Sequence, residues 1–460
     1  IYYLMSEIQY AGECSVKTVE LISSAGVIHD LKPTCLEINI FEDIFLVNGL
    51  TGNLVFTDTN NLLQNLPIIG QEQLLLKITT PSLDDESIDF TENALVIWKV
   101  SSVDEISTGA SAVTLEFCSQ ESLRNQRVRV SRSYNDTPSK IIENILTDER
   151  YLASKKLFEV EETIGVRNII SPNVRPFNQI KTLMQECVNK DGAPHYLFYE
   201  STQGYNFRTL QDLYSQDPIG AFHNGDPNED DASSTRGIQE SLDRIVQMDI
   251  KSANNQLIDS AAGLFGSKIF THNIFDKSYN VTTYDYFENF DEHKRISETE
   301  SFPKYNETEQ KFVDSRIYVH PTSKTKGNLD AAYADENNQN SSAVANKIGD
   351  SLLSRKSRMH EIFSGKKIGL SVHGTIGICA GKMVNINYVA PGRVHDDGQT
   401  TDKYISGNYL ITKTKHTFKP VTSTHMIHMM VSRDSNTTEL KFIENVPEVK
   451  TSGKAEVIEL

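Results

Sequence analysis

The sequence predicts a mainly β protein with two tube-like antiparallel β-barrel domains, a helix-containing α/β domain and a peripheral domain. Three observations predict this fold. Two regions consist of short alternating runs separated by turn residues, the region between them changes to helical periodicity, and the two strand-rich regions share a spacing of strands and glycines. The chain of 460 residues is also too long for one ordinary hydrophobic core, so several domains are expected.

The first barrel domain is predicted over residues 1–135. Short runs separated by Gly, Asn, Asp or Pro at this density are typical of a barrel or sandwich. The expected strands are Val16–Ser23, Cys35–Leu46, Gly52–Thr57, Gln73–Thr79, Ala94–Val103, Val113–Gln120 and Gln126–Val130. Trp98 is expected to pack in the core of this barrel because its large ring is mostly apolar.

The α/β domain is predicted over residues 136–235. Thr137 and Pro138 form the pattern of a helix N-cap with proline at the first helical position. A second helix is expected to begin near Arg175, and its apolar residues follow the spacing of one buried face. These residues are Phe177, Ile180, Leu183, Met184, Cys187 and Val188.

The same domain is expected to end with a hairpin and a loop. Tyr196–Glu200 and Tyr205–Thr209 have the pattern of short strands, and the turn residues between them predict a hairpin. The run Asp217–Ser234 is rich in Asp, Gly, Pro, Asn and Ser, which predicts a long exposed loop.

The second barrel domain is predicted over residues 236–288 and 365–445, with a C-terminal tail at 446–460. Its first expected strands are Arg244–Lys251, Lys268–Asn273 and Asn280–Tyr286. Residues 289–364 interrupt it as a peripheral insertion. Within this insertion Asn289–Asn340 is polar, with few apolar clusters beyond Arg316–Val319, and one clear helix, Ser341–Phe363, is expected to end at a C-cap glycine, Gly365.

An internal repeat relates the two strand-rich regions. Gly70 precedes the run Leu74–Ile78, and Gly381 precedes the run Met383–Tyr388 at a similar distance. After a polar loop each region continues with two more strands. These are Ala94–Val103 and Val113–Gln120 in the first region, and Asn408–Phe418 and Thr424–Arg433 in the second. The repeat favours two similar domains, and coincidental strand spacing is the alternative.

Composition excludes several classes of protein. The formal net charge is −17, which is the wrong sign for a protein that binds nucleic acid by neutralising its phosphates. Solubility is the simple interpretation of this charge, and an acid-lined passage for DNA is the alternative. The five cysteines are scattered without metal-ligand spacing, which predicts buried free thiols in a reducing cytoplasm. No apolar stretch approaches the roughly 20 residues that cross a bilayer, and Ile1–Tyr10 lacks the pattern of a signal peptide.

No catalytic, cofactor-binding or metal-binding residue is predicted. His395, Asp396 and Asp397 lie between glycines and are interpreted as turn residues rather than ligands. His425 and His428 are three residues apart, so on a strand they would point to opposite faces and would not share a metal. The sequence has no G-x-S-x-G, HExxH, Walker or GxGxxG motif, and we expect no enzyme activity.

Three groups of residues carry a resemblance to a known family. Phe41–Phe45 with Leu66–Glu72, then Phe198–Arg208, and then Ser406–Ile411 with His416 follow one another in the expected order. They resemble the first domain, the middle domain and the last barrel strand pair of the baseplate hub proteins of contractile-tail bacteriophages (myophages), the T-even-like hub family. The polar stretch Asn289–Asn340 departs from the family pattern, which leaves the shape and partner of the peripheral domain open.

The resemblance implies a homotrimer in which each subunit supplies two barrels, so that three chains present six units around one axis. Such a ring is a symmetry adaptor that joins a hexameric tail tube protein to a trimeric central spike protein, with baseplate wedge and tape-measure proteins as further candidate partners. DNA would pass through its lumen during ejection without specific binding, with no cofactor and no membrane insertion. The implied location is the phage tail of the virion, after assembly in the host cytoplasm.

Two alternatives remain open at this point. The first is the hub of a phage-derived contractile injection system or a type VI-like secretion system, which would have the same fold in another setting. The second is a tail-associated cell-wall hydrolase, which would need a carboxylic acid of raised pKa paired with a second carboxylate.

Overall fold

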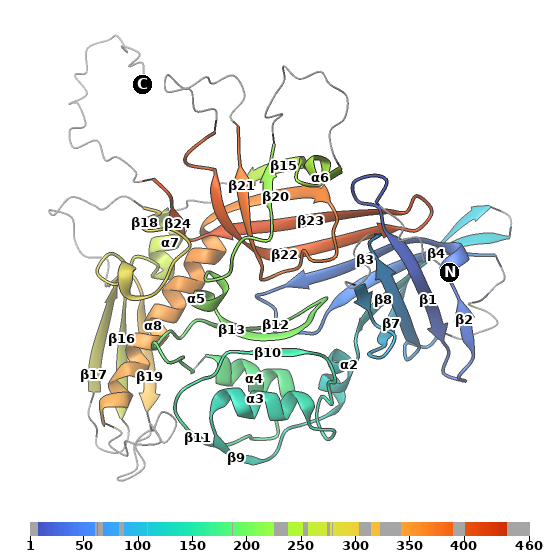
Figure 1. Cartoon of the computed structure of the whole chain (residues 1–460). Helices are drawn as coiled ribbons and strands as arrows, with labels where there is room; N and C mark the ends of the chain where they lie inside the picture. Colours follow the sequence, from blue (N-terminus) through green and yellow to red (C-terminus); the bar gives the residue numbers. More distant parts are fainter. Residues whose placement is uncertain are drawn as a thin grey trace, which may run out of the picture.

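A computed structural model describes most of the chain. The described residues are 8–438 except 60–61, 63–67, 82–86, 108, 186, 225–237, 252–255, 274–276, 278, 303–313, 323–341 and 390–400. Within them the protein is mainly β, with large antiparallel sheets and a few helices (Figure 1). The predicted fold class is therefore confirmed.

The largest sheet of the structure has 14 strands. Eleven of them follow the order β15-β20-β23-β22-β3-β4-β8-β7-β5-β1-β2, and β6, β14 and β21 pair with strands of this sheet outside that order. Its first eight strands in the chain are β1 (Ser15–Ile22), β2 (Ile28–Asp30), β3 (Cys35–Asp43), β4 (Thr51–Asp58), β5 (Gln73–Thr79), β6 (Ser87–Asp89), β7 (Leu95–Ser107) and β8 (Ala110–Ser119). The other six are β14 (Ala221–His223), β15 (Ile245–Lys251), β20 (Lys366–His373), β21 (Met383–Asn387), β22 (Gly407–Lys419) and β23 (Thr424–Arg433).

The sheet contains the same order of six strands twice, although β14 pairs parallel with β21 whereas β1 pairs antiparallel with β5. The order β1-β5-β7-β8-β4-β3 in the first half matches β14-β21-β22-β23-β20-β15 in the second, and the matching strands also follow one another in the same order along the chain. We call these two halves module one and module two. The predicted pairs of repeated strands, β5 with β21, β7 with β22 and β8 with β23, hold corresponding places in the two modules.

β-Bulges strengthen this correspondence. Leu36 in β3 and Val246 in β15 are the extra residues at the start of matching strands. Trp98 in β7 and Thr412 in β22 are extra residues at another matching position. Bulges re-aim strands and are kept as designed features, so two bulges at the same two places indicate one duplicated module.

Glycines with left-handed backbone also recur. Gly70 (φ +88°) and Gly381 (φ +91°) each precede the matching strands β5 and β21. A Cβ on Gly381 would lie 1.9 Å from the hydroxyl of Tyr199, so this turn needs glycine both for its φ and for the close approach of the middle domain.

Each module has its own core. Core one gathers the inward residues of β1, β3, β4, β5, β7 and β8, such as Val19, Leu54 and Phe117. Core two gathers those of β20 to β23, such as Val372, Tyr409 and Val431. The sheet curls around each core into a barrel. Module two closes through a bridge between His223 and Arg244, and module one closes where the tip of the β22–β23 hairpin meets the residues that precede β1.

A middle α/β unit packs below the sheet (Figure 1). Its elements are α2 (Gln120–Arg127), β9 (Ser133–Asp136), α3 (Pro138–Thr147), β10 (Phe158–Val160), β11 (Arg167–Ile170), α4 (Pro176–Met184), β12 (Tyr196–Ser201), β13 (Gly204–Thr209) and α5 (Leu210–Leu213). The predicted β12–β13 hairpin is present, and Thr137 holds the N-cap position of α3, although its side chain makes no cap hydrogen bond. The apolar face of the second helix is present as far as Met184, where α4 ends, so the predicted helix residues Cys187 and Val188 lie beyond it. The predicted strand Gln126–Val130 is wrong, because α2 continues through Arg127 and only Val130 forms an isolated bridge.

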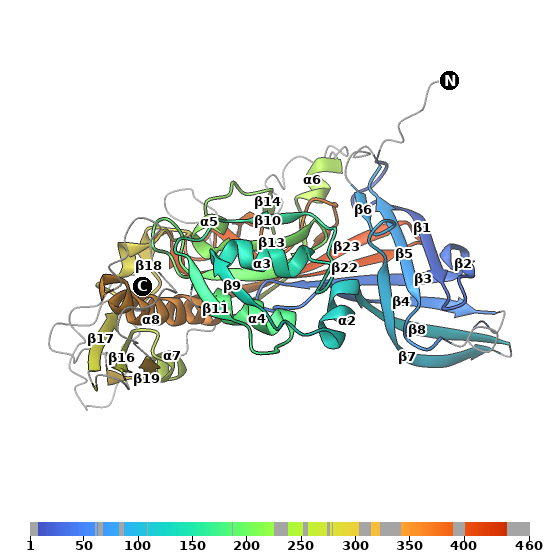
Figure 2. The same cartoon turned by 90° about the horizontal axis from the view of Figure 1, so that it is seen from below.

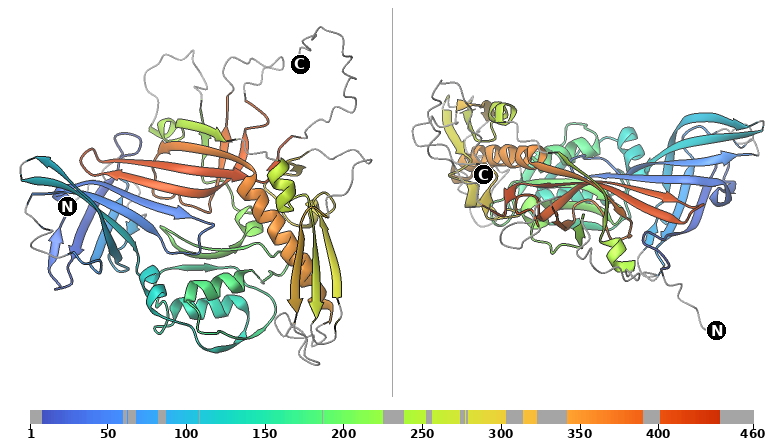
Figure 3. Two further views of the ribbon diagram at one scale, coloured as in Figure 1. Left: turned by 180° about the vertical axis from the view of Figure 1, so that it is seen from behind. Right: turned by 90° about the horizontal axis from the view of Figure 1, so that it is seen from above.

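A peripheral unit lies at the far end of module two (Figure 2). It contains α7 (Gln256–Ala262), β16 (Gly266–Asn273), β17 (Tyr279–Asp285), β18 (Thr299–Glu300), β19 (Ile317–Thr322), α8 (Ser342–Ser364) and β24 (Ser435–Asn436), while α6 (Ile238–Leu242) leads into β15. The unit also contains the short 3-10 helix Phe290–Glu292, in which Phe290 packs with Phe265 and Tyr286, while a second short 3-10 helix, Lys32–Thr34, directly precedes β3. Figure 3 shows α8 running from the end of the large sheet along this unit.

Four further details differ from the sequence-based expectations. β16 and β17, expected in the second barrel, instead form a separate sheet with β19, because one face of that sheet packs on α8. Within Asp217–Ser234, residues 221–223 form β14, and 225–234 lie outside the described residues. Trp98 is 48% exposed because the bulge turns it out of the core, and Lys99 covers its ring. Gly365 follows α8 as predicted, but its φ is not left-handed; a Cβ there would lie 2.6 Å from two carbonyl oxygens.

Candidate functional site

The two modules meet where β3 pairs with β22. The antiparallel register runs from Ile38 opposite Phe418 to Asp43 opposite Lys413. β22 pairs with β21 only over its first residues, Gly407–Leu410, so its second half offers an edge that β3 occupies. Phe418 belongs to core one although its strand belongs to module two. The junction is therefore a continuous sheet with an apolar anchor rather than a flexible linker.

Glu42 is the central polar residue of this junction and is fully buried. One carboxylate oxygen accepts the N–H of Thr202 at 2.5 Å, and the other accepts the N–H of Ala380 and the hydroxyl of Thr414, both at 2.6 Å. Burial on its own would raise the pKa of Glu42, but His416, Thr414 and the Ala380 amide outweigh it and lower that pKa. The ionised carboxylate thus ties β3 to the middle unit and to module two at once.

Glu200 forms a second buried anchor, between the middle unit and module one. It accepts the N–H of Leu50 at 2.7 Å and the hydroxyl of Ser119 at 2.6 Å. Lys156 lies between Glu200 (2.7 Å) and Glu121 (2.8 Å) and is itself almost fully enclosed. Burial lowers the pKa of Lys156, but the two carboxylates more than offset it and raise that pKa.

Two buried histidines lie beside Glu42. Nδ1 of His416 is 3.2 Å from Nε2 of His425, and Nε2 of His416 is 3.9 Å from a carboxylate oxygen of Glu42. Burial, with the neighbouring His416, lowers the pKa of His425 well below its usual value. This pair was missed in the sequence because cross-strand pairing, and not spacing along the chain, brings the two rings together.

The histidines considered as metal ligands do not form a metal site in the described part of the chain. His425 is buried, whereas His428 points outward and contacts the Ser371 hydroxyl at 2.8 Å, so the predicted opposite faces are confirmed. No group of three potential ligands comes together among the described residues. His395, Asp396 and Asp397 lie outside the described residues. The five cysteines are buried and free, as predicted.

A groove of about 610 Å³ lies over the junction on the face that points away from both cores. Its lining includes Phe41, Lys415, His428 and Met430. The carboxylates in its lining all have partners. Glu42 and Glu200 are held as described above, Asp43 lies 2.8 Å from Lys413, and Asp249 lies 3.4 Å from Lys251. Carboxylates that are all held by partners suit a surface used for assembly better than a site for general acid–base catalysis.

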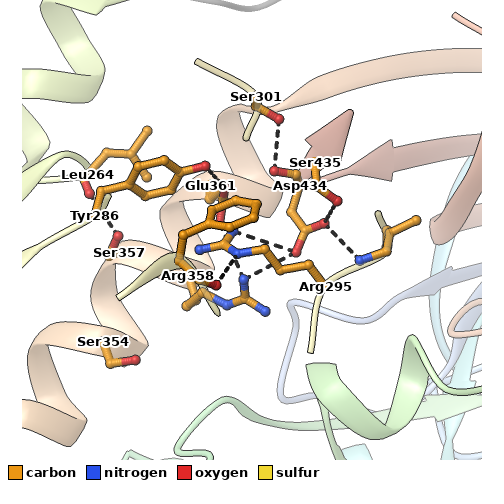
Figure 4. A network of polar contacts seen from close by, with 12 residues as sticks. Leu264, Tyr286, Arg295, Ser301, Ser354, Ser357, Arg358, Glu361, Asp434 and Ser435 are labelled. Atoms are coloured by element: carbon orange, nitrogen blue, oxygen red, sulfur yellow. Dashed lines mark hydrogen bonds and ion pairs between the residues drawn. The ribbon is translucent and has the colours of Figure 1, made fainter. Parts of the chain in front are cut away.

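A buried charge network fixes the peripheral unit to module two (Figure 4). Arg358 of α8 lies 3.4 Å from Asp434, which directly follows β23, and Arg295 pairs with Glu361 of α8. Tyr286 donates to Glu361 at 2.7 Å. Burial raises the pKa of Glu361 although the two arginines oppose it. Two cations therefore face two carboxylates, and removing one member would leave a buried charge without its partner.

Comparisons with known proteins identify the fold. No known family profile and no curated protein matches the sequence. A tail protein from Neisseria meningitidis MC58 is similar in structure, with a TM-score of 0.51 and 10% identity over 92% of this chain and 99% of that one. The 43 kDa tail protein of prophage MuSo2 from Shewanella oneidensis gives 0.48, with 10% identity over 91% and 98%. Prophage tail protein gp18 from Listeria monocytogenes EGD-e gives 0.44, with 10% identity over 91% and 95%.

At 10% identity the likeness to the Neisseria tail protein extends to the fold alone. The chain therefore shares the fold of that protein along nearly its whole length. Among the described residues, no helix is long and apolar enough to span a bilayer.

Proposed function

We propose that this chain is the baseplate hub subunit of a contractile phage tail, a non-enzymatic protein that forms a trimeric ring between a hexameric tail tube and a trimeric central spike. The observation that carries the proposal is the duplicated module: six strands in the same order, with two bulges at the same places, occur twice in one chain. Three copies would present six nearly equivalent modules to a sixfold neighbour while keeping threefold symmetry toward the other.

The rigid junction supports this role. A ring that transmits force between tube and spike needs its modules at a fixed angle. The β3–β22 pairing, the anchor at Glu42 and the anchor at Glu200 hold both modules and the middle unit together without a flexible linker.

The face that points away from both cores is the one we assign to the lumen. Two of its lysines lie in ion pairs: Lys413 with Asp43 at 2.8 Å, and Lys99 with Glu116 at 3.1 Å. Paired charges offer no continuous basic track for phosphates, and a DNA strand would slide past them without arrest. On this reasoning the pairing of lysines with carboxylates, rather than an excess of acidic residues, keeps DNA from binding to the wall of the passage.

The oligomeric state tests the proposal. Size-exclusion chromatography with light scattering on the purified chain, alone and mixed with its spike partner, is expected to give a trimer. A monomer under both conditions would overturn the proposal. A zymogram against bacterial cell walls is expected to show no clearing, and clearing that tracks with the purified chain would favour the hydrolase alternative.

A further inference from the structure

Two histidines form a contact between the middle unit and the peripheral unit. His195 directly precedes β12 and is fully buried. Its Nε2 lies 3.2 Å from the hydroxyl oxygen of Ser354 on α8. Its ring also packs edge-on against the ring of His293, which directly follows the 3-10 helix Phe290–Glu292, with 5.0 Å between the ring centroids. Nδ1 of His195 is buried and has no hydrogen-bond partner among the described residues, so a second ring proton would find no acceptor there.

Arginines of α8 hold the two segments that carry these histidines. Arg355 donates to the carbonyl oxygen of Pro194 at 2.8 Å, the residue before the buried histidine. Arg358 donates to the carbonyl oxygen of Lys294 at 2.8 Å, the residue after its partner. Both arginines are buried, and no ion pair joins Arg355 to a carboxylate in the described part of the chain. The two rings therefore lie beside cations that are largely withdrawn from water.

The charges around the histidine pair do not balance. The buried cations are Arg295, Arg355 and Arg358, and the buried carboxylates are Glu361 and Asp434 of the charge network (Figure 4). A thiol and a phenol, Cys187 and Tyr214, are also near and are neutral at pH 7. Asp191 is the remaining carboxylate near His293, but it is exposed, so water screens its charge. A proton on either ring would add to an existing excess of buried positive charge.

We propose that this contact is acid-sensitive: it is closed while His195 and His293 are neutral, and it opens when protonation of the two rings adds to the charge of the arginines. A neutral imidazole can stay buried, whereas a buried cation without a counter-ion is strongly destabilising. In the open form water would solvate both protonated rings. This inference goes beyond the proposed function and does not depend on the oligomeric state of the chain.

The pKa values of the two histidines agree with this geometry. Burial, followed by Arg358 and His293, lowers the pKa of His195 well below its usual value. Burial, followed by Arg358 and Arg295, lowers the pKa of His293 to about 4, although Asp191 opposes the shift. An exposed histidine has a pKa of about 6.5, so the open contact binds more protons than the closed one. The contact is therefore most stable above about pH 6.5 and weakens as the pH falls toward the folded values.

The other contacts of the middle unit confine the opening to a small region. Leu213 belongs to an apolar cluster with Ile362 of α8, and neither side chain titrates. Glu42 holds the β12–β13 turn, and its lowered pKa keeps it ionised below the usual value of about 4.3. Acid is therefore expected to free the segments around Pro194 and Lys294, while the modules and the β12–β13 hairpin keep their structure.

Backbone hydrogen exchange measured by mass spectrometry on the full chain tests the proposal. The segments to follow are 187–196 and 290–296, with rates corrected for the pH dependence of chemical exchange. If opening takes up two protons, the opening equilibrium of these segments should rise about 20–50-fold between about pH 6 and pH 5. In His293→Asn one ring no longer titrates, so the rise should fall to about 7-fold.

His373→Asn is the matched control. His373 is a partly buried histidine at the end of β20, and burial lowers its pKa too, but it does not belong to this contact, so the variant should keep the full rise. An opening equilibrium that stays constant between the two pH values would overturn the proposal, and so would an equal rise in His293→Asn and the unmodified chain. Loss of protection in β4 of module one at the same pH would also overturn it, because the chain would then be unfolding as a whole.

Discussion

Replacing Glu42 by glutamine tests whether one buried carboxylate holds three units together. Glutamine keeps the shape of the side chain but supplies only one acceptor oxygen. If that oxygen keeps the bonds from Ala380 and Thr414, the new amide group faces the N–H of Thr202, donor against donor. A charge-assisted hydrogen bond contributes about 1.5–3 kcal/mol, and an unpaired buried amide costs about 1–3 kcal/mol. The two energies overlap, so the expected loss is smaller than their sum.

The expected loss for Glu42→Gln is therefore about 2–4 kcal/mol in the free energy of unfolding. Denaturant unfolding followed by fluorescence gives this number, and hydrogen exchange locates it, because the β12–β13 turn at Ser201–Gly204 should lose protection first. Glu37→Gln is the matched control on the same strand: Glu37 accepts one bond from Asn39, which glutamine can still accept, so a change below about 0.5 kcal/mol is expected.

The pH dependence gives an independent check. The pKa of Glu42 is lower in the folded protein than in the unfolded chain, so its contribution is present above the unfolded value of about 4.3 and is lost as the pH falls through the folded value. The stability gap between the unmodified protein and Glu42→Gln should therefore narrow below about pH 4. A gap of less than 0.5 kcal/mol at pH 7, with unchanged exchange at the turn, would refute the role assigned to Glu42.

Two other substitutions have equally direct outcomes. Lys156→Met removes the cation that lies between Glu121 and Glu200 and should cost about 3–5 kcal/mol at pH 7 in denaturant unfolding, while Lys155→Met at the neighbouring exposed position should stay within about 0.5 kcal/mol. Since the folded pKa of Lys156 is raised, its contribution is present below the unfolded value of about 10.4 and is lost as the pH rises through the folded value. Gly381→Ala should lower thermal stability far more than Gly26→Ala, because both glycines have positive φ but only Gly381 lacks room for a Cβ, so equal effects of the two would contradict the packing argument.

Local signals in the sequence were sufficient for much of the fold. The β12–β13 hairpin and the helix that begins at Pro138 depend on turn and cap residues a few positions apart, and both were predicted. The repeat was predicted from glycine and strand spacing, although identity between the two regions is slight. Core packing then explains why such different sequences fold alike: inward positions such as Leu54 and its counterpart Leu370 are buried in both modules.

Long-range contacts account for what the sequence did not reveal. Trp98 was expected in the core because the added residue of a bulge has no local signature that would turn it outward. Glu42 was one acid among many in the sequence. Its role depends on Thr202 and Ala380, which lie 160 and 338 residues away. The sheet of β16, β17 and β19 was missed because only the tertiary fold places α8 against it.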